Sequence, residues 1–455
     1  MPTPPPATPR ALLSDLFRIA VKAAAPGPAL LAALESRKPE PVRAVHILAL
    51  GKAAHPMAGA AVEHLRQQGR APAGGILIGA EPAPAPHPAL RVVTGEHPEP
   101  GAGSLAAARA LGEAVARVGP EDEAWVLLSG GTTSLIAAPI EGISPEQLTT
   151  LYRLLLGSGL DISAMNRIRK RFSLWGGGRL TAALAPACVK NFTISDVIGD
   201  DLGSIGSGPC VPDDSSAAEV RLALTSAGLW EKIPDAFRTT LTAVEKGLAP
   251  ETPKPGDPAF RNLETRLVAS NRLALEAMVK QASQLGIAAR VMGADLAGEA
   301  SETGRHLATL LLTYSDPEIP QPALHKNATV LIWGGETTVT LGPNPGRGGR
   351  NQELALAAAQ VLAASDLPSR DQVTILSAGT DGRDGPTDAA GAIVDASTWA
   401  AIRKAGRDPA RDLRGHDANP ALEAGHALLI TGMTGTNVMD VVAGLIMPAG
   451  SAHPA

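Results

Sequence analysis

The alternation of short apolar, β-prone runs with helical segments constrains the fold of this chain more than any other feature of the sequence. This alternation is typical of βαβ units, whose parallel sheet is covered by helices on both faces. We therefore expect an α/β fold with a parallel sheet covered by helices on both faces. The expected strands are residues 42–50, 74–78, 91–94, 125–128, 189–194, 267–270, 288–292, 328–333, 372–376 and, as the last one, 428–431.

The length of 455 residues indicates two or three domains, since a domain has roughly 100–200 residues. We expect one α/β domain over residues 11–250 and a second over residues 260–447. The segment 250–258 is rich in proline and charge, so it is the expected linker and the hinge for domain closure. The sequence leaves open which domain the N-terminal helix, expected over residues 11–25, packs against.

Composition and charge argue against several classes of protein. The net charge is −5 and there is no basic block, so a nucleic-acid partner is not expected. Cys188 and Cys210 provide neither a disulfide framework nor metal-ligand spacing, as is typical of a reducing compartment. Every long apolar stretch is broken by glycine, proline or charge, and residues 1–10 lack the order of a signal peptide. We therefore expect a cytoplasmic protein without a membrane partner.

Small, polar and charged residues follow many of the expected strands. The loops in question are residues 51–52, 129–134, 195–207, 334–336, 377–388 and 431–437. In open α/β sheets, ligands bind outside the carboxyl ends of the strands. Glycine lets the main chain approach a ligand there, and hydroxyl and amide groups hold phosphate or carboxylate oxygens. One such loop is explained by turning alone, but the whole set indicates a ligand site, which we expect in a cleft between two domains.

The glycine-rich stretch 333–357 contains the longest of these loops. An apolar run leads into Gly334 and Gly335, a Pro/Gly loop follows, and an Ala/Leu-rich helix begins at Arg350. Glycines before a helix N-terminus suit a phosphate, because the first N–H groups are unpaired and carry partial positive charge. A long turn needs the same glycines, so the loop by itself does not decide between these readings. Arg350 is the candidate for catalysis, whereas Arg347 could as easily point into solvent.

Several common nucleotide and hydrolase motifs are absent from the sequence. The first expected strand ends in Gly51-Lys52-Ala53-Ala54, which lacks the second and third glycines of the dinucleotide-binding G-x-G-x-x-G. There is no G-x-x-x-x-G-K-[ST] loop, no G-x-S-x-G elbow and no H-E-x-x-H helix. Hydride transfer, P-loop chemistry and common hydrolase chemistry therefore have no support in the sequence.

The remaining pattern places acidic loops beside basic ones. The acidic candidates are Asp196, Asp200, Asp201, Asp381, Asp384 and Asp388, and the basic candidates are Lys52, Arg347 and Arg350. Carboxylates suit Mg²⁺ when phosphates complete its shell, and Lys or Arg neutralises phosphoryl oxygens. Phosphoryl transfer needs this pairing. Loop aspartates also cap helices and form Asx turns, and we expect about half of these aspartates to do so.

Motifs spread over nearly the whole chain carry a resemblance to a known family. They are LGKAA at 50–54, TGEHPEP at 94–100, LLSGGTTSL at 127–135, SDVIGDDLGSIGSGP at 195–209, GGETTVTL at 334–341, GRGGRNQELALA at 346–357 and SAGTDGRDGPTDAAGAIVD at 377–395. They resemble the glycerate 2-kinases whose C-terminal module is called the MOFRL domain. The resemblance implies a Rossmann-like domain, a C-terminal α/β domain containing the MOFRL region at about 327–440, and an interdomain cleft. It also implies ATP- and Mg²⁺-dependent phosphorylation of D-glycerate to 2-phosphoglycerate.

The resemblance and the strand-end positions together assign roles to the candidate residues. Lys52 and Arg350 match positions that the family treats as essential, and Asp196 is the third catalytic candidate. The candidates for binding substrate and nucleotide are Ser129, Gly130, Gly131, Asp200, Gly334, Gly335, Glu336, Thr337, Gly348, Gly349 and Asp381. Asp196 and Asp381 are the candidate Mg²⁺ ligands, and which aspartate acts as the base stays open. His97, within Glu96-His97-Pro98, is a further candidate for ligand contact.

The sequence departs from the family pattern at three places. Gly176 stands where the S-x-x-K-G-G-R-L segment has lysine, so we expect either compensation by Arg171 or Arg179 or an altered substrate affinity. Met433 replaces a proline, and Cys210 stands where threonine is common.

Two other functions are compatible with the sequence. One is a hydroxypyruvate reductase, a name that members of this family have carried, although the dinucleotide motif is missing. The other is a non-catalytic sensor of small acids. The carbon that is phosphorylated follows from the resemblance alone, and the oligomeric state, a homo-oligomer included, stays open.

Overall fold

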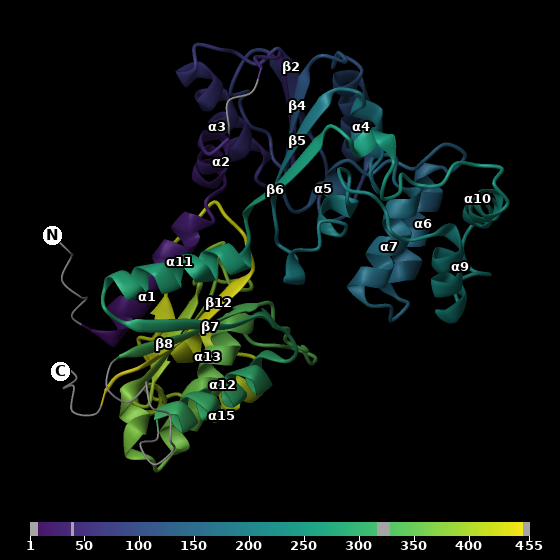
Figure 1. Ribbon diagram of the computed structural model, residues 1–455. Coiled ribbons are helices and arrows are strands. Elements are labelled where there is room, and N and C mark those ends of the chain that lie inside the picture. Colours follow the sequence, from purple (N-terminus) through teal and green to yellow (C-terminus); the bar gives the residue numbers. More distant parts are fainter. Residues whose placement is uncertain (1–7, 38–40, 316–327, 449–455) are drawn as a thin grey trace. The chain divides into compact units, whose positions relative to one another are not determined.

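The computed structural model describes residues 8–37, 41–315 and 328–448 (Figure 1). Residues 1–7 of the Pro-rich start lie outside this part. The chain forms two compact units, one of residues 26–268 and one that combines residues up to 25 with residues from 269 onward. We call them the parallel-sheet unit and the mixed-sheet unit, after their sheets.

The parallel-sheet unit contains six strands and nine α-helices in its described part. Its strands are β1 (Val45–Leu50), β2 (Gly74–Gly79), β3 (Leu90–Thr94), β4 (Glu123–Leu128), β5 (Cys188–Ile194) and β6 (Leu263–Ala269). Its helices are α2 (Pro26–Glu35), α3 (Ala54–Gln67), α4 (Ala102–Val115), α5 (Thr132–Leu135), α6 (Pro145–Leu156), α7 (Ile162–Phe172), α8 (Arg179–Leu184), α9 (Ala217–Ser226) and α10 (Asp235–Glu245).

The strand order of this sheet is β3-β2-β1-β4-β5-β6, and the pairs from β3 through β5 are parallel. All residues of β1 and β4 are buried, as expected for strands covered on both faces. Figure 1 shows α2 and α3 on one side of the sheet and α4 on the other. The order reverses between β1 and β4, which is the place where open α/β sheets bind ligands. The expectation of a parallel sheet is confirmed for this unit.

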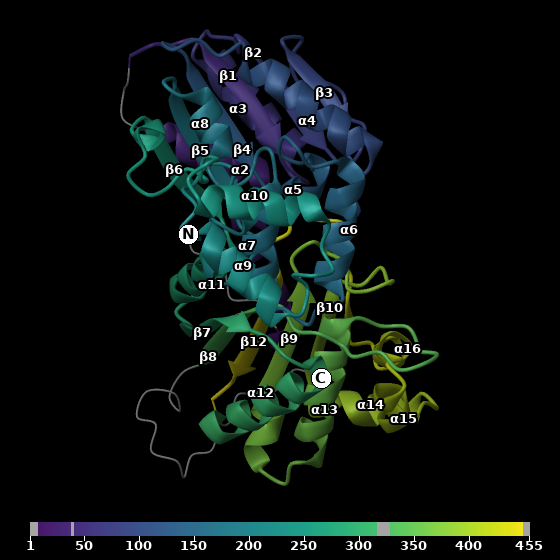
Figure 2. The ribbon, with the colours of Figure 1, turned by 90° about the vertical axis from the view of Figure 1, so that its right-hand side faces the viewer.

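Four helices of the parallel-sheet unit form a lobe with its own core. Figure 2 shows α6, α7, α9 and α10 gathered together. Leu151, Leu155, Val220 and Leu241 are among the fully buried side chains of this core. Phe172 of α7 and Phe237 of α10 meet edge to face, with ring centroids 4.7 Å apart. This geometry is favourable for aromatic pairs.

The predicted linker at 250–258 is wrong, because this segment is packed into the parallel-sheet unit. Thr252 is buried and donates a 2.9 Å hydrogen bond to the carboxylate of Asp213. The same carboxylate lies 2.8 Å from the ammonium of Lys170, and Glu251 pairs with the buried Arg171. Such a network cannot move as a free hinge without exposing unpaired charge.

The mixed-sheet unit contains six strands and seven α-helices in its described part. Its strands are β7 (Ala288–Leu296), β8 (Thr329–Gly335), β9 (Val373–Gly379), β10 (Gly391–Asp395), β11 (Leu428–Leu429) and β12 (Asp440–Ile446). Its helices are α1 (Pro9–Ala23), α11 (Asn271–Gln284), α12 (Ala300–Ser315), α13 (Arg350–Ala364), α14 (Thr398–Lys404), α15 (Pro409–Arg414) and α16 (Ala418–Ala424).

The second sheet is mixed, a feature that the alternation of strands and helices in the sequence does not predict. Its order is β11-β10-β9-β12-β8-β7, and only β7 and β8 are a parallel pair among the paired neighbours. The strand β12 lies antiparallel between β9 and β8. The sequence reading placed the last strand at 428–431 and missed β10 and β12. An all-buried strand such as β12 shows no alternation that would mark it.

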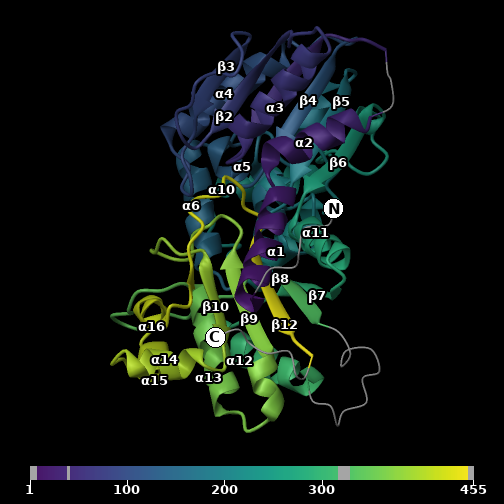
Figure 3. The same cartoon turned by 90° about the vertical axis from the view of Figure 1, so that its left-hand side faces the viewer.

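Helix α1 belongs to the mixed-sheet unit, so the expected domain boundaries 11–250 and 260–447 are wrong. Figure 3 shows α1 over the face of the sheet near β12 and β9, with α11 beside it. Leu13, Leu16 and Phe17 of α1 are almost fully buried. Arg10 donates hydrogen bonds to the carbonyl groups of Ile393 and Leu428, at the other end of the chain. The chain passes between the units at Ala25–Pro26 and again at Val268–Ala269.

Within the described residues, no single helix is both long and apolar enough to span a membrane; α1 and α2 meet that criterion only if counted as one broken segment.

Because α1 packs in the mixed-sheet unit, a core mutation in α1 should increase hydrogen exchange in that unit. Phe17→Ala removes a side chain that is 1% exposed and should cost about 3–5 kcal/mol. Hydrogen exchange should rise in α11 and β12 but not in β1 or β4. Leu30→Ala, on α2 of the parallel-sheet unit, is the matched control and should show the reverse pattern. Faster exchange in β1 with an unchanged α11 in Phe17→Ala would contradict the assignment.

Candidate functional site

The carboxyl edge of the parallel sheet gathers several of the predicted residues. Lys52 follows β1, Ser129 to Gly131 follow β4, Asp196 follows β5 and His97 follows β3. β1 and β4 are the strands between which the order reverses. Because parallel strands end at the same edge, residues distant in sequence meet there.

Two glycines bring these side chains close together. A β-carbon on Gly130 would overlap the carboxylate of Asp196. A β-carbon on Gly131, whose φ is 84°, would lie 3.0 Å from the His97 ring and 3.3 Å from the Cε atom of Lys52. The main-chain N–H of Lys52 also donates to the Gly130 carbonyl at 2.9 Å. The structure thus brings Lys52, Gly130, Gly131 and Asp196 into one cluster, and it adds His97 to them.

The charges of Lys52 and Asp196 affect the pKa values within this cluster. Burial raises the pKa of Asp196, while the charges of Lys52 and His97 oppose that rise. Burial and the neighbouring Lys52 lower the pKa of His97, which Asp196 partly offsets. Lys52 itself is exposed. A half-buried carboxylate beside an accessible ammonium can take a proton from a ligand while the ammonium stabilises negative charge.

Ser129 has a structural role that the sequence did not predict. Its hydroxyl donates to the Leu50 carbonyl at 3.2 Å and accepts from the main-chain N–H of Ala53 at 3.0 Å. It therefore joins the ends of β1 and β4. Its predicted contact with substrate stays a prediction.

Asp200 and Asp201, in the loop after Asp196, have different surroundings in the structure, although the sequence made both of them acidic candidates. The carboxylate of Asp201 closes its own turn, accepting from the N–H of Gly203 at 3.0 Å and from the hydroxyl of Ser204. This is the capping role expected for part of the acidic set. Asp200 has a φ of 55°, and the described residues give it no side-chain bond to Lys52 or Asp196. Its predicted ligand role stays a prediction.

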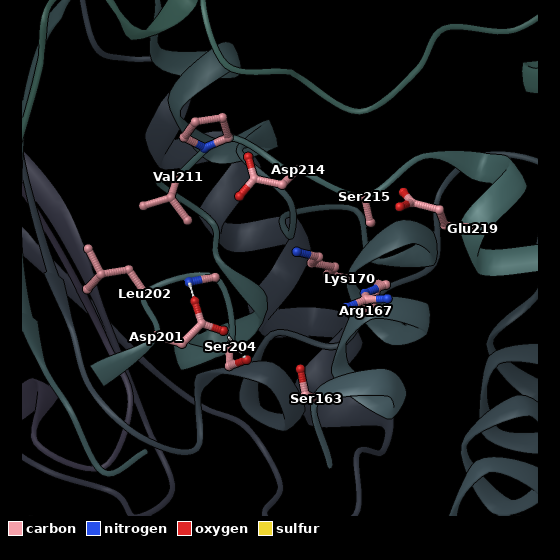
Figure 4. A pocket seen from close by; sticks show the side chains of 12 residues that line it. Ser163, Arg167, Lys170, Asp201, Leu202, Ser204, Val211, Asp214, Ser215 and Glu219 are labelled. Carbon is pink, nitrogen blue, oxygen red and sulfur yellow. Dashed lines mark hydrogen bonds between the residues drawn. The ribbon is translucent and has the colours of Figure 1, made fainter. Parts of the chain in front are cut away.

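A separate hollow of about 440 Å³ lies between α7, α9 and this loop (Figure 4). Arg167 and Lys170 of α7 project into it, and Asp201, Asp214 and Glu219 line it. Several of its charges have partners inside the protein. Lys170 pairs with the buried Asp213, and Glu219 accepts from the N–H and hydroxyl of Ser216 in front of α9.

The predicted compensation for Gly176 by Arg171 or Arg179 is not supported. Arg171 is 2% exposed and donates to the Ser215 carbonyl at 2.7 Å. Arg179 donates to the carbonyls of Lys170, Arg171, Ser173 and Gly176. Both guanidinium groups are therefore used inside the protein. A β-carbon on Gly176 would itself lie 3.1 Å from the Ser207 carbonyl oxygen, so a larger residue fits poorly here.

In the mixed-sheet unit, Arg350 and Asp440 form the centre of the candidate site. Asp440, the first residue of β12, lies in register with Gly335 at the end of β8 and Gly379 at the end of β9. An antiparallel central strand thus delivers its first residue to the edge where its neighbours end. Arg350, the first residue of α13, donates to Asp440 through Nε at 2.5 Å and through Nη2 at 3.0 Å.

Glu336 is the second partner of Arg350, at 2.7 Å from Nη1. Burial alone would lower the pKa of Arg350, but the bonds to Asp440 and the charge of Glu336 raise it above its ordinary value. The Arg350 side chain keeps 35% of its surface exposed, whereas that of Asp440 keeps 5%. The guanidinium is thus fixed in orientation and still reachable by an anion.

The N-terminus of α13 does not offer the free amides that the glycine-rich loop suggested. The carboxylate of Asp384 accepts from the main-chain N–H groups of Asn351 at 3.1 Å and Gln352 at 2.9 Å. It also accepts from both side-chain amides. A β-carbon on Gly349 would overlap Asp384, and one on Gly346 would overlap Asp417. The glycines therefore admit the protein's own carboxylates, and a phosphate at this terminus is not supported; ligand contact by Gly348 and Gly349 stays a prediction.

Gly334, Gly335 and Thr337 also have structural explanations. A β-carbon on Gly334 would overlap the side-chain oxygen of Asn271, and one on Gly335 would overlap Leu296. Asn271 is 2% exposed and donates to the carbonyls of Val438 and Asp440. Thr337 is 4% exposed. Their predicted contacts with nucleotide are untested.

Asp381 follows β9 and lies near Asp440, since both carboxylates flank the same face of Gly379. Burial raises the pKa of Asp381, and the negative Asp440 adds to the rise, against the N–H of Arg383 and the charge of Arg350. Over the described ranges, no set of three His, Cys, Asp or Glu side chains is arranged to hold a metal. The carboxylate of Asp381 therefore fits a cation only if a ligand supplies most of its shell.

The sequence missed Asp440 and Asn271, which together fix the position of Arg350. Asp440 could have been found only by recognising residues 440–446 as a strand. Asn271 follows β6 and begins α11, so it shared the strand-end pattern that selected the other loops.

An order-reversing parallel sheet and a mixed sheet, each with charged residues at one edge, define a two-unit α/β protein. The model "Domain of unknown function (DUF4147)" matches residues 12–242, and that of the MOFRL family matches residues 329–440. The chain is 37% identical to a D-glycerate 2-kinase of Thermotoga maritima, over 89% of this chain and 91% of that one. It is 34% identical to the human glycerate kinase, over 94% and 91%, and 35% identical to a putative hydroxypyruvate reductase of Agrobacterium vitis, over 96% and 94%.

The crystal structure of the Thermotoga maritima glycerate kinase matches with a TM-score of 0.84 at 34% identity, covering 96% of this chain and 99% of the other. The chain therefore belongs to the glycerate kinase family with a C-terminal MOFRL region, as the motifs indicated.

The four bonds to Asp384 predict that Asp384→Asn is destabilising. The new amide would turn N–H groups toward the donors of Asn351 and Gln352, and the loss should be about 1–3 kcal/mol. Urea unfolding measures it. Asp366→Asn changes an exposed aspartate in the loop after α13 and should shift the midpoint little. Equal midpoints for the two variants would contradict the capping role.

Proposed function

We propose that this protein is a glycerate 2-kinase, which transfers the γ-phosphoryl group of ATP to D-glycerate and forms 2-phosphoglycerate. The observation that carries the proposal is the cluster of Lys52 and Asp196 at the order-reversing edge of the parallel sheet, in a chain of this family. Phosphoryl transfer asks a protein mainly for positioning and for stabilisation of negative charge.

Each residue of the cluster has a role in this reaction. Asp196 accepts the proton of the attacking hydroxyl, because its raised pKa makes it a better base than an ordinary aspartate. Lys52 stabilises the charge that develops on the substrate or on the phosphoryl oxygens. Main-chain amides of the turn Ser129-Gly130-Gly131 donate to the substrate.

Arg350 acts on the phosphates of the nucleotide. Asp440 and Glu336 hold its guanidinium in a fixed plane, which limits the entropy lost when it binds an anion. Asp381 would take part in holding Mg²⁺, whose shell the phosphates would largely complete. The bound ion would offset negative charge on the transferred group.

A hydroxypyruvate reductase is the second candidate, since a relative carries that name. The order β3-β2-β1-β4-β5-β6 is shared with dinucleotide-binding folds, but the loop after β1 has Ala53 and Pro56 where the G-x-G-x-x-G fingerprint has its second and third glycines. Oxidation of NADH with hydroxypyruvate tests this function. ADP release with D-glycerate, L-glycerate, tartronate and hydroxypyruvate tests the kinase, and a sensor would bind without releasing ADP.

Removing either cation should cost most of the activity. Lys52→Ala and Arg350→Ala should each lower kcat/KM for D-glycerate by at least ~10²-fold, because each loses charge stabilisation in the transition state. A coupled ADP-release assay measures the effect. Lys232→Ala and Arg403→Ala remove exposed cations elsewhere in the two units and should keep activity within about twofold. Near-normal activity of Lys52→Ala would refute its role.

The raised pKa of Asp196 predicts the acid limb of the pH profile. A base must be deprotonated, so kcat/KM should fall as the pH drops, and its apparent pKa should lie above the ordinary aspartate value of 3.8. Asp196→Asn should lose at least ~10²-fold in kcat/KM and flatten this limb. Asp201→Asn changes a turn aspartate in the same loop and should preserve the limb. A limb that persists in the Asp196 variant would assign the base elsewhere.

A further inference from the structure

Two adjoining hollows lie beside the Arg350 cluster, entirely within the mixed-sheet unit. One has a volume of about 450 Å³ and is lined by residues that include Arg347, Arg383, Thr387 and Met433. The other has about 480 Å³ and includes Asn419, Leu428 and Ile430. Arg347 and Asp388 line both, so the two hollows are neighbours. Each is large enough for a substantial part of a nucleotide-sized ligand.

Two arginines give the first hollow its charge. The main chain of Arg347 is held on both sides, because its N–H donates to Asp417 at 2.9 Å and its carbonyl accepts from the N–H of Asn419 at 3.0 Å. Its side chain meets Glu423 only at 3.9 Å, and both are more than half exposed, so this ion pair is weak. Arg383 is exposed, and in the part of the chain that the structure describes its guanidinium has no ion pair. Both groups are therefore available to an anion.

Exposed apolar side chains line the same hollows. Met433 is 73% exposed and Ile430 is 56% exposed, so both present apolar surface that a ligand could cover. Asp388 is exposed between them and the arginines and can accept hydrogen bonds from hydroxyl groups. A ligand that matches this lining has a polyanionic end, hydroxyl groups and a flat apolar part.

Hydrogen bonds tie these loops to the candidate site. The N–H of Thr434 donates to the Asp381 carbonyl at 3.1 Å, and its hydroxyl donates to the Thr380 carbonyl at 2.6 Å. Gly382, with a φ of 84°, lets the loop after β9 pass directly against Gly432. The lining residues Gly382 and Arg383 therefore directly follow Asp381, which lies near Asp440.

We propose that these hollows bind the nucleoside triphosphate, with the phosphates on Arg347 and Arg383 and the base against Met433 and Ile430. This inference rests on the proposed kinase function and names the nucleotide subsite within it. It gives Arg347, whose role the sequence left open, a contact with ligand. It also gives Met433, a departure from the family pattern, a role in contacting the base.

The test measures direct binding of ADP and of inorganic triphosphate to the full chain by calorimetry. Arg347→Ala with Arg383→Ala should weaken both ligands at least ~10-fold, since the phosphates lose two charge-assisted contacts. Met433→Ser should weaken ADP about 3-fold or more and leave triphosphate unchanged, because only the base loses apolar contact. Arg403→Ala, on α14, is the matched control and should bind both ligands normally. Thermal unfolding confirms that each variant is folded.

The outcomes separate this inference from the kinase proposal. ADP affinity within twofold of the wild type in the folded double arginine variant, with kinase activity intact, overturns the nucleotide subsite alone. The expected losses in ADP binding, combined with no ADP release on any hydroxy acid, support the subsite and overturn the kinase function.

Discussion

The ion pair of Arg350 with Asp440 is the interaction on which the candidate site of the mixed-sheet unit depends. It joins the first residue of α13 to the first residue of β12, the strand that holds β8 and β9 together. Asp384 fixes the same helix from its own end by accepting four hydrogen bonds from Asn351 and Gln352. The Arg350 side chain is therefore positioned from two sides: Asp440 and Glu336 bind its guanidinium, and Asp384 holds the helix N-terminus from which it extends.

The parallel-sheet unit also gathers charged residues at one edge of its sheet, but by a different geometry. There the strands run in one direction, so their ends meet at one edge and bring Lys52, His97, Gly130 and Asp196 together. No ion pair shorter than 4 Å ties Lys52 down within the described residues, in contrast to Arg350. The two units thus differ in how they hold their candidate cation: Arg350 is fixed in orientation by carboxylates, and Lys52 is not.

The glycines of the chain show why a glycine-rich loop is ambiguous in sequence. Gly130 is close to a charged side chain of the candidate site, Asp196. Gly349 and Gly346 have the same close approach, but to Asp384 and Asp417, which serve the packing of α13 and its neighbours. Both uses need a residue without a β-carbon. Only the identity of the neighbour separates them, and that neighbour lies far away in sequence.

The sequence by itself determined the α/β class and the charged strand-end loops. It also identified Lys52, Asp196 and Arg350 as the catalytic candidates. These follow from local patterns and from motifs that each lie within a short stretch. The tertiary structure decided that β12 inserts antiparallel, that α1 packs with the second unit, and that Asp440 and Asp384 hold α13 in place. Those outcomes depend on contacts between residues that lie about 30 to several hundred positions apart in the sequence. A strand that is buried on both faces also lacks the alternation of apolar and polar residues by which a strand is recognised in a sequence.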